Sequence, residues 1–148
     1  MEILRALGCR DYFQAEDGTQ AIQVMRSQEV DIVITDWMMQ PMDGVTFIRE
    51  VRNAPDSPNR FVPIIMVTGH TTKRQVGEAR DAGVNEFLAK PITGRGVLDR
   101  IRRVIDADRS FVKSETYFGP DRRRRNDPLY EGPFRRSSDG SNHKVFEL

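Results

Sequence analysis

Short runs of consecutive apolar residues, separated by segments with helical spacing, constrain this fold more than any other feature of the sequence. Residues 32–34 and 64–67 are apolar at every position, which is typical of strands buried on both faces of a parallel sheet. Residues 86–89 and 12–15 are shorter candidates for the same role. Apolar residues repeat at helical spacing over residues 19–27, 43–51, 72–82 and 93–105. This alternation predicts an α/β fold with a mostly parallel sheet.

Polar residues follow each of the expected strands. Glu16 and Asp17 follow the first, Asp36 the second, Thr68 the third and Lys90 the fourth. In a parallel sheet covered by helices, ligands and chemistry lie beyond the carboxyl ends of the strands. We therefore expect a carboxylate, a hydroxyl and an ammonium group to converge on one edge of the sheet.

Charge and composition exclude several classes of protein. The 148 residues hold 23 Lys and Arg against 22 Asp and Glu, which excludes a polyanion-binding domain that is basic throughout. The single cysteine, Cys9, excludes an internal disulfide and a zinc site built from cysteines. No apolar stretch approaches the roughly 20 residues that span a bilayer, and the first residues lack the pattern of a secretory signal. These observations favour a cytoplasmic location.

The last part of the chain differs in composition from the rest. Residues 109–148 hold 9 Lys and Arg against 6 Asp and Glu, whereas residues 1–108 hold 14 against 16. The basic part also contains Pro120, Pro128 and Pro133 and few aliphatic residues. Because it has little apolar surface to offset the loss of chain entropy, we predict a domain over residues 1–108 and a disordered tail over residues 109–148.

Three segments carry a resemblance to a known family. Residues 31–44 read Asp-Ile-Val-Ile-Thr-Asp-Trp-Met-Met-Gln-Pro-Met-Asp-Gly, residues 63–69 Pro-Ile-Ile-Met-Val-Thr-Gly, and residues 86–91 Glu-Phe-Leu-Ala-Lys-Pro. In this order and separation, they resemble the receiver domain of two-component response regulators, of the single-domain chemotaxis-regulator type. Residues 15–21 resemble that family's second strand turning into its second helix. The resemblance covers residues 1–108 and implies a flavodoxin-like, doubly wound parallel sheet.

The resemblance implies a phosphoryl-transfer chemistry. Asp36 matches the family's phospho-acceptor, a carboxylate that attacks a phosphohistidine and forms an acyl phosphate. Lys90 would supply a positive charge and Thr68 a hydroxyl donor to the phosphoryl oxygens. The family also uses Mg²⁺, which Asp36, the backbone carbonyl of Met38 and waters would hold.

Two further positions match the family's conformational switch. Lys90 precedes Pro91, and the resemblance implies a cis peptide there, which would aim the lysine at the site. Phe87 matches the switch aromatic, which turns inward when the hydroxyl of Thr68 moves toward the phosphoryl group. This change would alter the surface that contacts the output partner.

One part of the family pattern is missing. The family begins with an apolar strand that ends in two acidic residues, which help to hold Mg²⁺, whereas residues 1–8 resemble the end of the helix that follows it. Asp36 is then the only positioned carboxylate for a metal, so we expect this chain to bind Mg²⁺ poorly. Either Met1 lies inside a longer coding sequence, or the chain is a degenerate receiver that loads phosphate poorly. The intact Asp36, Thr68 and Lys90 favour the first explanation.

The tail contains a short repeat. Residues 117–123 and 130–136 both fit Tyr-x-Gly-Pro-x-Arg-Arg. Aromatic and Arg side chains together suit anionic or aromatic partners, so the repeat is either a binding motif or a chance similarity within a linker. The candidate contact residues are Tyr117, Arg122, Arg123, Tyr130, Arg135 and Arg136.

The sequence thus predicts a receiver that accepts a phosphoryl group on Asp36 from a sensor histidine kinase or a histidine phosphotransfer protein. Such a protein is a phospho-acceptor rather than an enzyme, and its output passes through contact with a downstream protein, because no DNA-binding domain follows. The alternative is a non-phosphorylated receiver that acts as a docking module through its Arg-rich tail. A metal-dependent phosphatase that uses Asp36 is disfavoured, because no second acid is positioned nearby.

Overall fold

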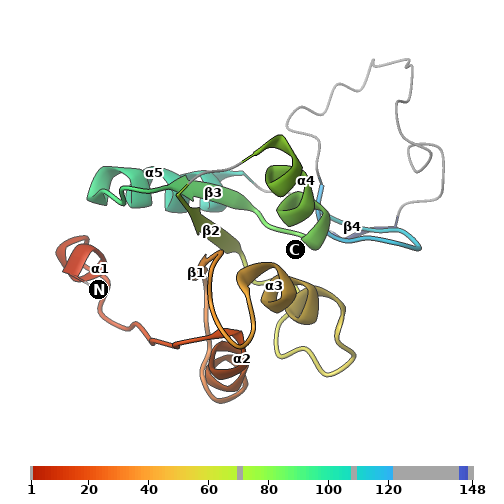
Figure 1. Cartoon of the computed structure of the whole chain (residues 1–148). Helices are drawn as coiled ribbons and strands as arrows, with labels where there is room; N and C mark the ends of the chain where they lie inside the picture. Colours follow the sequence, from red (N-terminus) through yellow and green to blue (C-terminus); the bar gives the residue numbers. More distant parts are fainter. Residues whose placement is uncertain (1, 70–71, 108–109, 122–143, 147–148) are drawn as a thin grey trace.

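A computed structural model describes residues 2–69, 72–107, 110–121 and 144–146 of the chain (Figure 1). Its body contains a parallel sheet of three strands in the order β1-β2-β3. The central strand β2 is buried at every position, as its run of apolar residues predicts. The strands are β1 (Val33–Asp36), β2 (Ile64–Thr68) and β3 (Glu86–Ala89).

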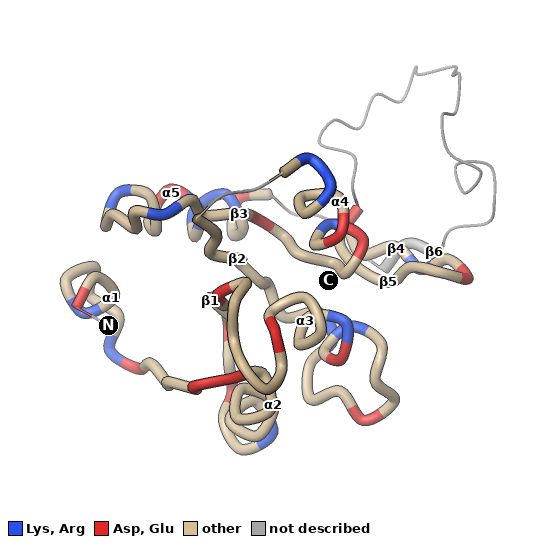
Figure 2. The backbone as a smooth tube through the Cα atoms, viewed as in Figure 1, with Lys and Arg blue, Asp and Glu red and all other residues tan. Residues whose placement is uncertain are grey.

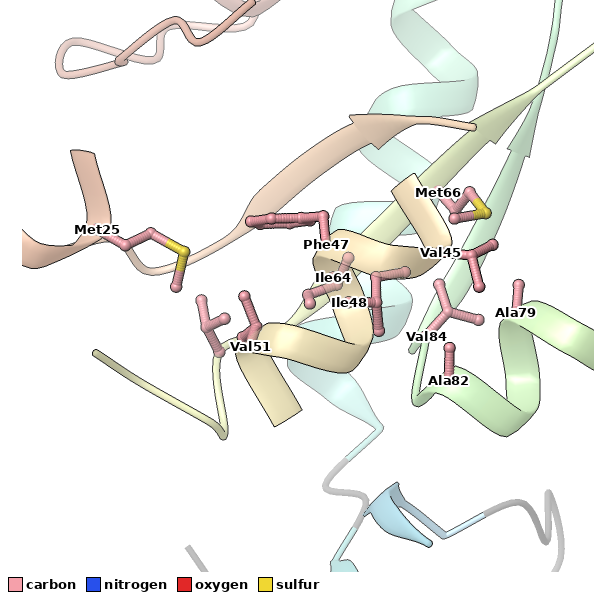
Figure 3. Packing of buried hydrophobic residues seen from close by; sticks show 11 residues of the cluster. Met25, Val45, Phe47, Ile48, Val51, Ile64, Met66, Ala79, Ala82 and Val84 are labelled. Carbon is pink, nitrogen blue, oxygen red and sulfur yellow. The ribbon is translucent and has the colours of Figure 1, made fainter. Parts of the chain in front are cut away.

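Helices cover both faces of this sheet, which confirms the doubly wound α/β class. Alternate residues of β2 point to opposite faces, so that Ile64 and Met66 join one core cluster while Ile65 and Val67 join another. The first cluster includes buried residues of α2, α3 and α4 (Figure 3), and residues of α1 and α5 pack against the second. The helices are α1 (Glu2–Ala6), α2 (Gly18–Ser27), α3 (Gly44–Asn53), α4 (Lys73–Ala82) and α5 (Gly94–Asp106).

The four longer helices begin where the sequence provides a capping side chain. Asp17, Asp43, Thr72 and Thr93 each accept hydrogen bonds from backbone N–H groups of the first turn. These groups have no partner inside the helix, so a side-chain acceptor fixes the starting residue. Gly83 ends α4 in the left-handed region, with a φ of 105°, as predicted for a stop at this residue.

The strand predicted at residues 12–15 is wrong. The structure assigns no strand to residues 11–15. A strand needs a hydrogen-bonded neighbour for its backbone, and among the described residues β1 pairs only with β2. The apolar character of the segment is therefore not enough to make it part of the sheet.

The predicted boundary at residue 108 also needs correction. A second, antiparallel sheet in the order β5-β4-β6 is formed by β4 (Phe111–Lys113), β5 (Phe118–Pro120) and β6 (Lys144–Phe146). Two aromatic residues, Phe111 and Phe118, hold this sheet against the receiver. Both are buried, and their ring centroids lie 5.1 and 5.4 Å from the ring centroid of Phe61. The average composition of the segment does not reveal this packing. The tail prediction is therefore wrong for residues 110–121 and 144–146. Residues 122–143, with Arg122, Arg123, Tyr130, Arg135 and Arg136, lie outside the described residues.

Charge is mixed over the surface helices. Lys and Arg alternate with Asp and Glu along α4 and α5 rather than gathering on one wholly basic face (Figure 2). Within the part of the chain that the structure describes, no helix has the length and apolar character needed to cross a bilayer.

Candidate functional site

Asp36 and Lys90 form an ion pair at the carboxyl edge of the sheet. Asp36 is the last residue of β1, and Lys90 directly follows β3. The Nζ of Lys90 donates to Oδ2 of Asp36, while the backbone N–H of Met38 donates to Oδ1 at 3.2 Å. The Asp36 side chain remains 35 % exposed, so its carboxylate can be reached from solvent. The sequence predicts this convergence of carboxylate and ammonium from strands that are distant along the chain.

Thr68 completes the predicted group at the end of β2. Its residue is 6 % exposed, and its carbonyl oxygen accepts a hydrogen bond of 2.8 Å from the backbone N–H of Lys90. The strand register places Thr68 opposite Ala89 and Asp36 opposite Val67. The three strand ends therefore lie side by side, as the parallel topology requires.

The loop after Asp36 is held in a close turn that requires glycine at residue 44. A Cβ on Gly44 would lie 2.2 Å from the carbonyl oxygen of Asp36, a distance that no side chain can occupy. The N–H of Gly44 donates to the carbonyl of Trp37 at 3.1 Å, and Asp43 caps α3 through a bond of 2.7 Å to the N–H of Thr46. Gly44 is not among the residues predicted for the site, although the Asp-Gly pair before an apolar helix is a signal for such a turn.

The two switch positions have clear places in the structure. The Lys90–Pro91 peptide is cis, which confirms that prediction, and the Gln40–Pro41 peptide is cis as well. Phe87 is partly buried and packs against the cluster formed by α2, α3 and α4, and its carbonyl accepts a hydrogen bond of 2.6 Å from Nε of Arg100. Its role as a switch stays a prediction.

The acidic residues near the predicted edge do not assemble into a metal site. Asp17 caps α2, accepting from the N–H groups of Thr19 and Gln20 at 2.6 and 3.1 Å. Over the described ranges, no group of three or more His, Cys, Asp and Glu residues is placed to hold an ion. Asp36 offers one carboxylate, and both of its oxygens already accept hydrogen bonds. Mg²⁺ is a hard cation that demands near-octahedral oxygen coordination, so the described residues do not by themselves fit a preformed Mg²⁺ site. Its predicted ligands, Asp36 and the carbonyl of Met38, stay a prediction.

Comparison with known proteins agrees with this geometry. Residues 1–102 match the response regulator receiver domain family. The chain is 35 % identical over 104 residues to the chemotaxis protein CheY of Pseudomonas aeruginosa, a match that covers 70 % of this chain and 82 % of that protein. It is 34 % identical over 103 residues to CheY1 of Helicobacter pylori strain 26695, covering 69 % of this chain and 82 % of that protein.

Solved structures show the same fold. The receiver domain of the sensor histidine kinase PA1611 of Pseudomonas aeruginosa has a TM-score of 0.62 and 31 % identity, over 72 % of this chain and 84 % of that one. In that structure a magnesium ion is coordinated in the active site cleft. CheY4 of Vibrio cholerae has a TM-score of 0.61 and 28 % identity, over 70 % of this chain and 86 % of that one. The fold and its polar edge define a receiver of two-component signalling. The chain belongs to the response regulator receiver domain family, and it resembles the single-domain CheY type.

Proposed function

We propose that this protein accepts a phosphoryl group on Asp36 from the phosphohistidine of a sensor histidine kinase or of a histidine phosphotransfer protein. The observation that carries the proposal is the ion pair between Lys90 and the partly exposed carboxylate of Asp36. A lysine held against a carboxylate at the edge of a sheet supplies a fixed positive charge where a phosphoryl group arrives with its negative oxygens.

The chemistry balances with the groups that are present. A carboxylate oxygen of Asp36 forms a bond to phosphorus while the bond between phosphorus and the histidine nitrogen breaks, and that nitrogen keeps the electron pair and takes up a proton. Lys90 follows the negative charge from the carboxylate to the phosphoryl oxygens, because its amine already lies on Oδ2. Thr68, at the end of the neighbouring strand, supplies a hydroxyl at the same edge.

The partners follow from this chemistry. The donor carries a phosphohistidine, and the output is contact with a downstream protein. We place both in the cytoplasm, where soluble receivers meet their kinases. The docking-module alternative shares the same fold, but in it Asp36 is not modified and the Arg-rich tail does the binding.

A small phosphodonor tests the proposal without knowledge of the kinase. Acetyl phosphate, with and without Mg²⁺, should add the mass of one phosphoryl group to the full chain, and Asp36→Asn should abolish the addition. Asp31→Asn is the matched control, because Asp31 is an exposed aspartate just before β1 and outside the site. Labelling that survives in the Asp36→Asn protein, or a wild-type chain that stays unlabelled under both conditions, would contradict the proposal and favour the docking module.

A further inference from the structure

Arg52 is a charged residue that the proposed chemistry does not use, and it is completely buried. It lies in the last turn of α3 and is 0 % exposed. Burial lowers the pKa of its guanidinium well below its usual range, to about 9, while the nearby Tyr117 acts in the opposite direction. The group is therefore still charged at neutral pH, and a buried charge is tolerated only where acceptors surround it.

The acceptors of Arg52 come from separate parts of the chain. Its Nε donates to the carbonyl of Gly83 at 3.1 Å, one terminal nitrogen to the carbonyl of Arg60 at 2.7 Å, and the other to Oδ1 of Asn85 at 3.0 Å. The guanidinium also lies 5.2 Å from the centre of the Phe111 ring. One side chain thus joins the end of α3, the loop before β2, the turn between α4 and β3, and the strand β4.

Residues 110–121, which we call the C-terminal clamp, are fitted closely onto this junction. A Cβ on Gly119 would lie 3.0 Å from Cα of Gly83 and 2.6 Å from the hydroxyl of Tyr117. That hydroxyl donates to the carbonyl of Pro120 at 2.7 Å. The Tyr-x-Gly-Pro part of the first repeat is therefore a turn. In it, the side chain of Tyr117 lies over Gly119, and Gly119 packs against Gly83 of the receiver. Phe118 is buried beneath Arg60, whose guanidinium is 5.4 Å from the ring centre.

Two elements run from the Asp36 site to the Arg52 junction. The helix α3 begins at Gly44, against the carbonyl of Asp36, and carries Arg52 in its last turn. The strand β3 follows Asn85, which bonds Arg52, and leads into Lys90, which bonds Asp36. Figure 1 shows β4 beside the α3 and α4 side of the body. Each element is thus tied at one end to the phospho-acceptor and at the other to the residue that holds the clamp.

We propose that docking of the C-terminal clamp and phosphorylation of Asp36 oppose each other. This inference rests on the proposed function. A phosphoryl group on Asp36 draws Lys90 away from the carboxylate, and Lys90 is continuous with β3. The hydrogen bonds of Arg52 to Gly83 and Asn85 resist a shift of that strand, and the docked clamp keeps Arg52 in place. Coupling between two equilibria is reciprocal, so phosphorylation loosens the clamp by the same factor by which the docked clamp disfavours phosphorylation.

Hydrogen exchange of the full chain tests the first direction. Beryllium fluoride, a stable mimic of a phosphoryl group, is added with Mg²⁺, and fluorescence of Trp37, the single tryptophan and the neighbour of Asp36, reports its binding. The clamp is read at the amides of Ser114 and Asp121, which donate to the carbonyls of Tyr117 and Ser110 at 2.8 and 2.9 Å. We expect their exchange to become about fivefold faster or more when the mimic binds.

A variant tests the reverse direction. Phe118→Ala, and the milder Tyr117→Phe, should lower the mimic concentration needed for half of the Trp37 response by a similar factor. Phe13→Ala, at a residue that is 50 % exposed, is the control and should leave that concentration unchanged. A Trp37 response with unchanged exchange at Ser114 and Asp121 would overturn this inference alone. Absence of both a Trp37 response and an acetyl phosphate label would overturn the proposed function and the inference with it.

Discussion

Lys90 and Met38 divide the two carboxylate oxygens of Asp36 between them. The lysine amine bonds Oδ2, and the backbone N–H of Met38 bonds Oδ1. The backbone contact fixes the orientation of the carboxylate, while the lysine supplies a charge that can move with the incoming group. Asp36 is thus held in place before a donor arrives, which lowers the cost of ordering it during transfer.

Removal of the lysine charge should slow transfer without unfolding the protein. Lys90→Met keeps the length of the side chain but removes the ammonium, and we expect labelling by acetyl phosphate to slow about a hundredfold. Lys73→Met, on an exposed lysine at the start of α4, should leave the rate within error of the wild type. Equal rates in the two variants, measured by intact mass over time, would contradict the role given to Lys90.

The glycines at the start of α3 and inside α4 have opposite effects on the stability of the fold. Gly44 begins α3 in a space too small for a methyl group, whereas an added Cβ on Gly77, inside α4, would have no atom within 4 Å other than those of its chain neighbours and its own helix backbone. The first glycine is required by the loop that carries Asp36. The second loses conformational entropy on folding without a compensating contact.

Alanine at these two positions should therefore change stability in opposite directions. Gly44→Ala forces the Asp36 loop apart and should lower the free energy of unfolding by about 1–3 kcal/mol. Gly77→Ala should raise it by about 0.5–1 kcal/mol, because alanine is the better helix former. Urea denaturation followed by circular dichroism measures both. An unchanged free energy of unfolding in Gly44→Ala would contradict the close contact between residue 44 and the carbonyl of Asp36.

The same elements show what could be predicted from sequence and what could not. Helices α2 to α5 combine apolar spacing with a capping residue, so their type and starts follow from local chemistry. The convergence of Asp36, Thr68 and Lys90 follows from parallel topology alone. The strand predicted at residues 12–15 fails because pairing depends on a neighbour, which no local pattern reveals. The requirement for glycine at residue 44 could not be predicted, because it depends on a single close contact with the carbonyl oxygen of Asp36.

At the scale of the whole molecule, the C-terminal clamp extends the receiver beyond residue 108. Phe61, Phe111 and Phe118 form an aromatic cluster beside the buried Arg52. The average polarity of the segment does not predict this packing. Two phenylalanines are enough to dock a polar segment where the receiver offers an apolar surface. Arg52 was likewise beyond prediction, since a lone arginine near the end of an amphipathic helix normally lies in solvent.

The contribution of Arg52 can be measured against a neighbour on the same helix. Arg52→Ala removes the donor to the carbonyls of Gly83 and Arg60, whereas Oδ1 of Asn85 keeps the N–H of Ile64 at 2.9 Å. We expect the free energy of unfolding to fall by about 3 kcal/mol. Arg49→Ala removes a half-exposed ion pair of 3.7 Å with Glu78 and should cost less than about 1 kcal/mol. Thermal and urea unfolding of both variants decide the matter. Similar small losses in the two variants would show that the buried hydrogen bonds of Arg52 add little to the stability of the fold.

The most direct test of the central claim is to locate the modified atom. Borohydride reduces an acyl phosphate on aspartate to the alcohol of homoserine, which marks the phosphorylated residue permanently. After treatment with acetyl phosphate and then borohydride, peptide mapping by mass spectrometry should find homoserine at residue 36 and at no other aspartate. Homoserine at Asp17 or Asp43 instead, or an unmodified residue 36 in a chain that carries the label, would contradict the assignment of Asp36 as the phospho-acceptor.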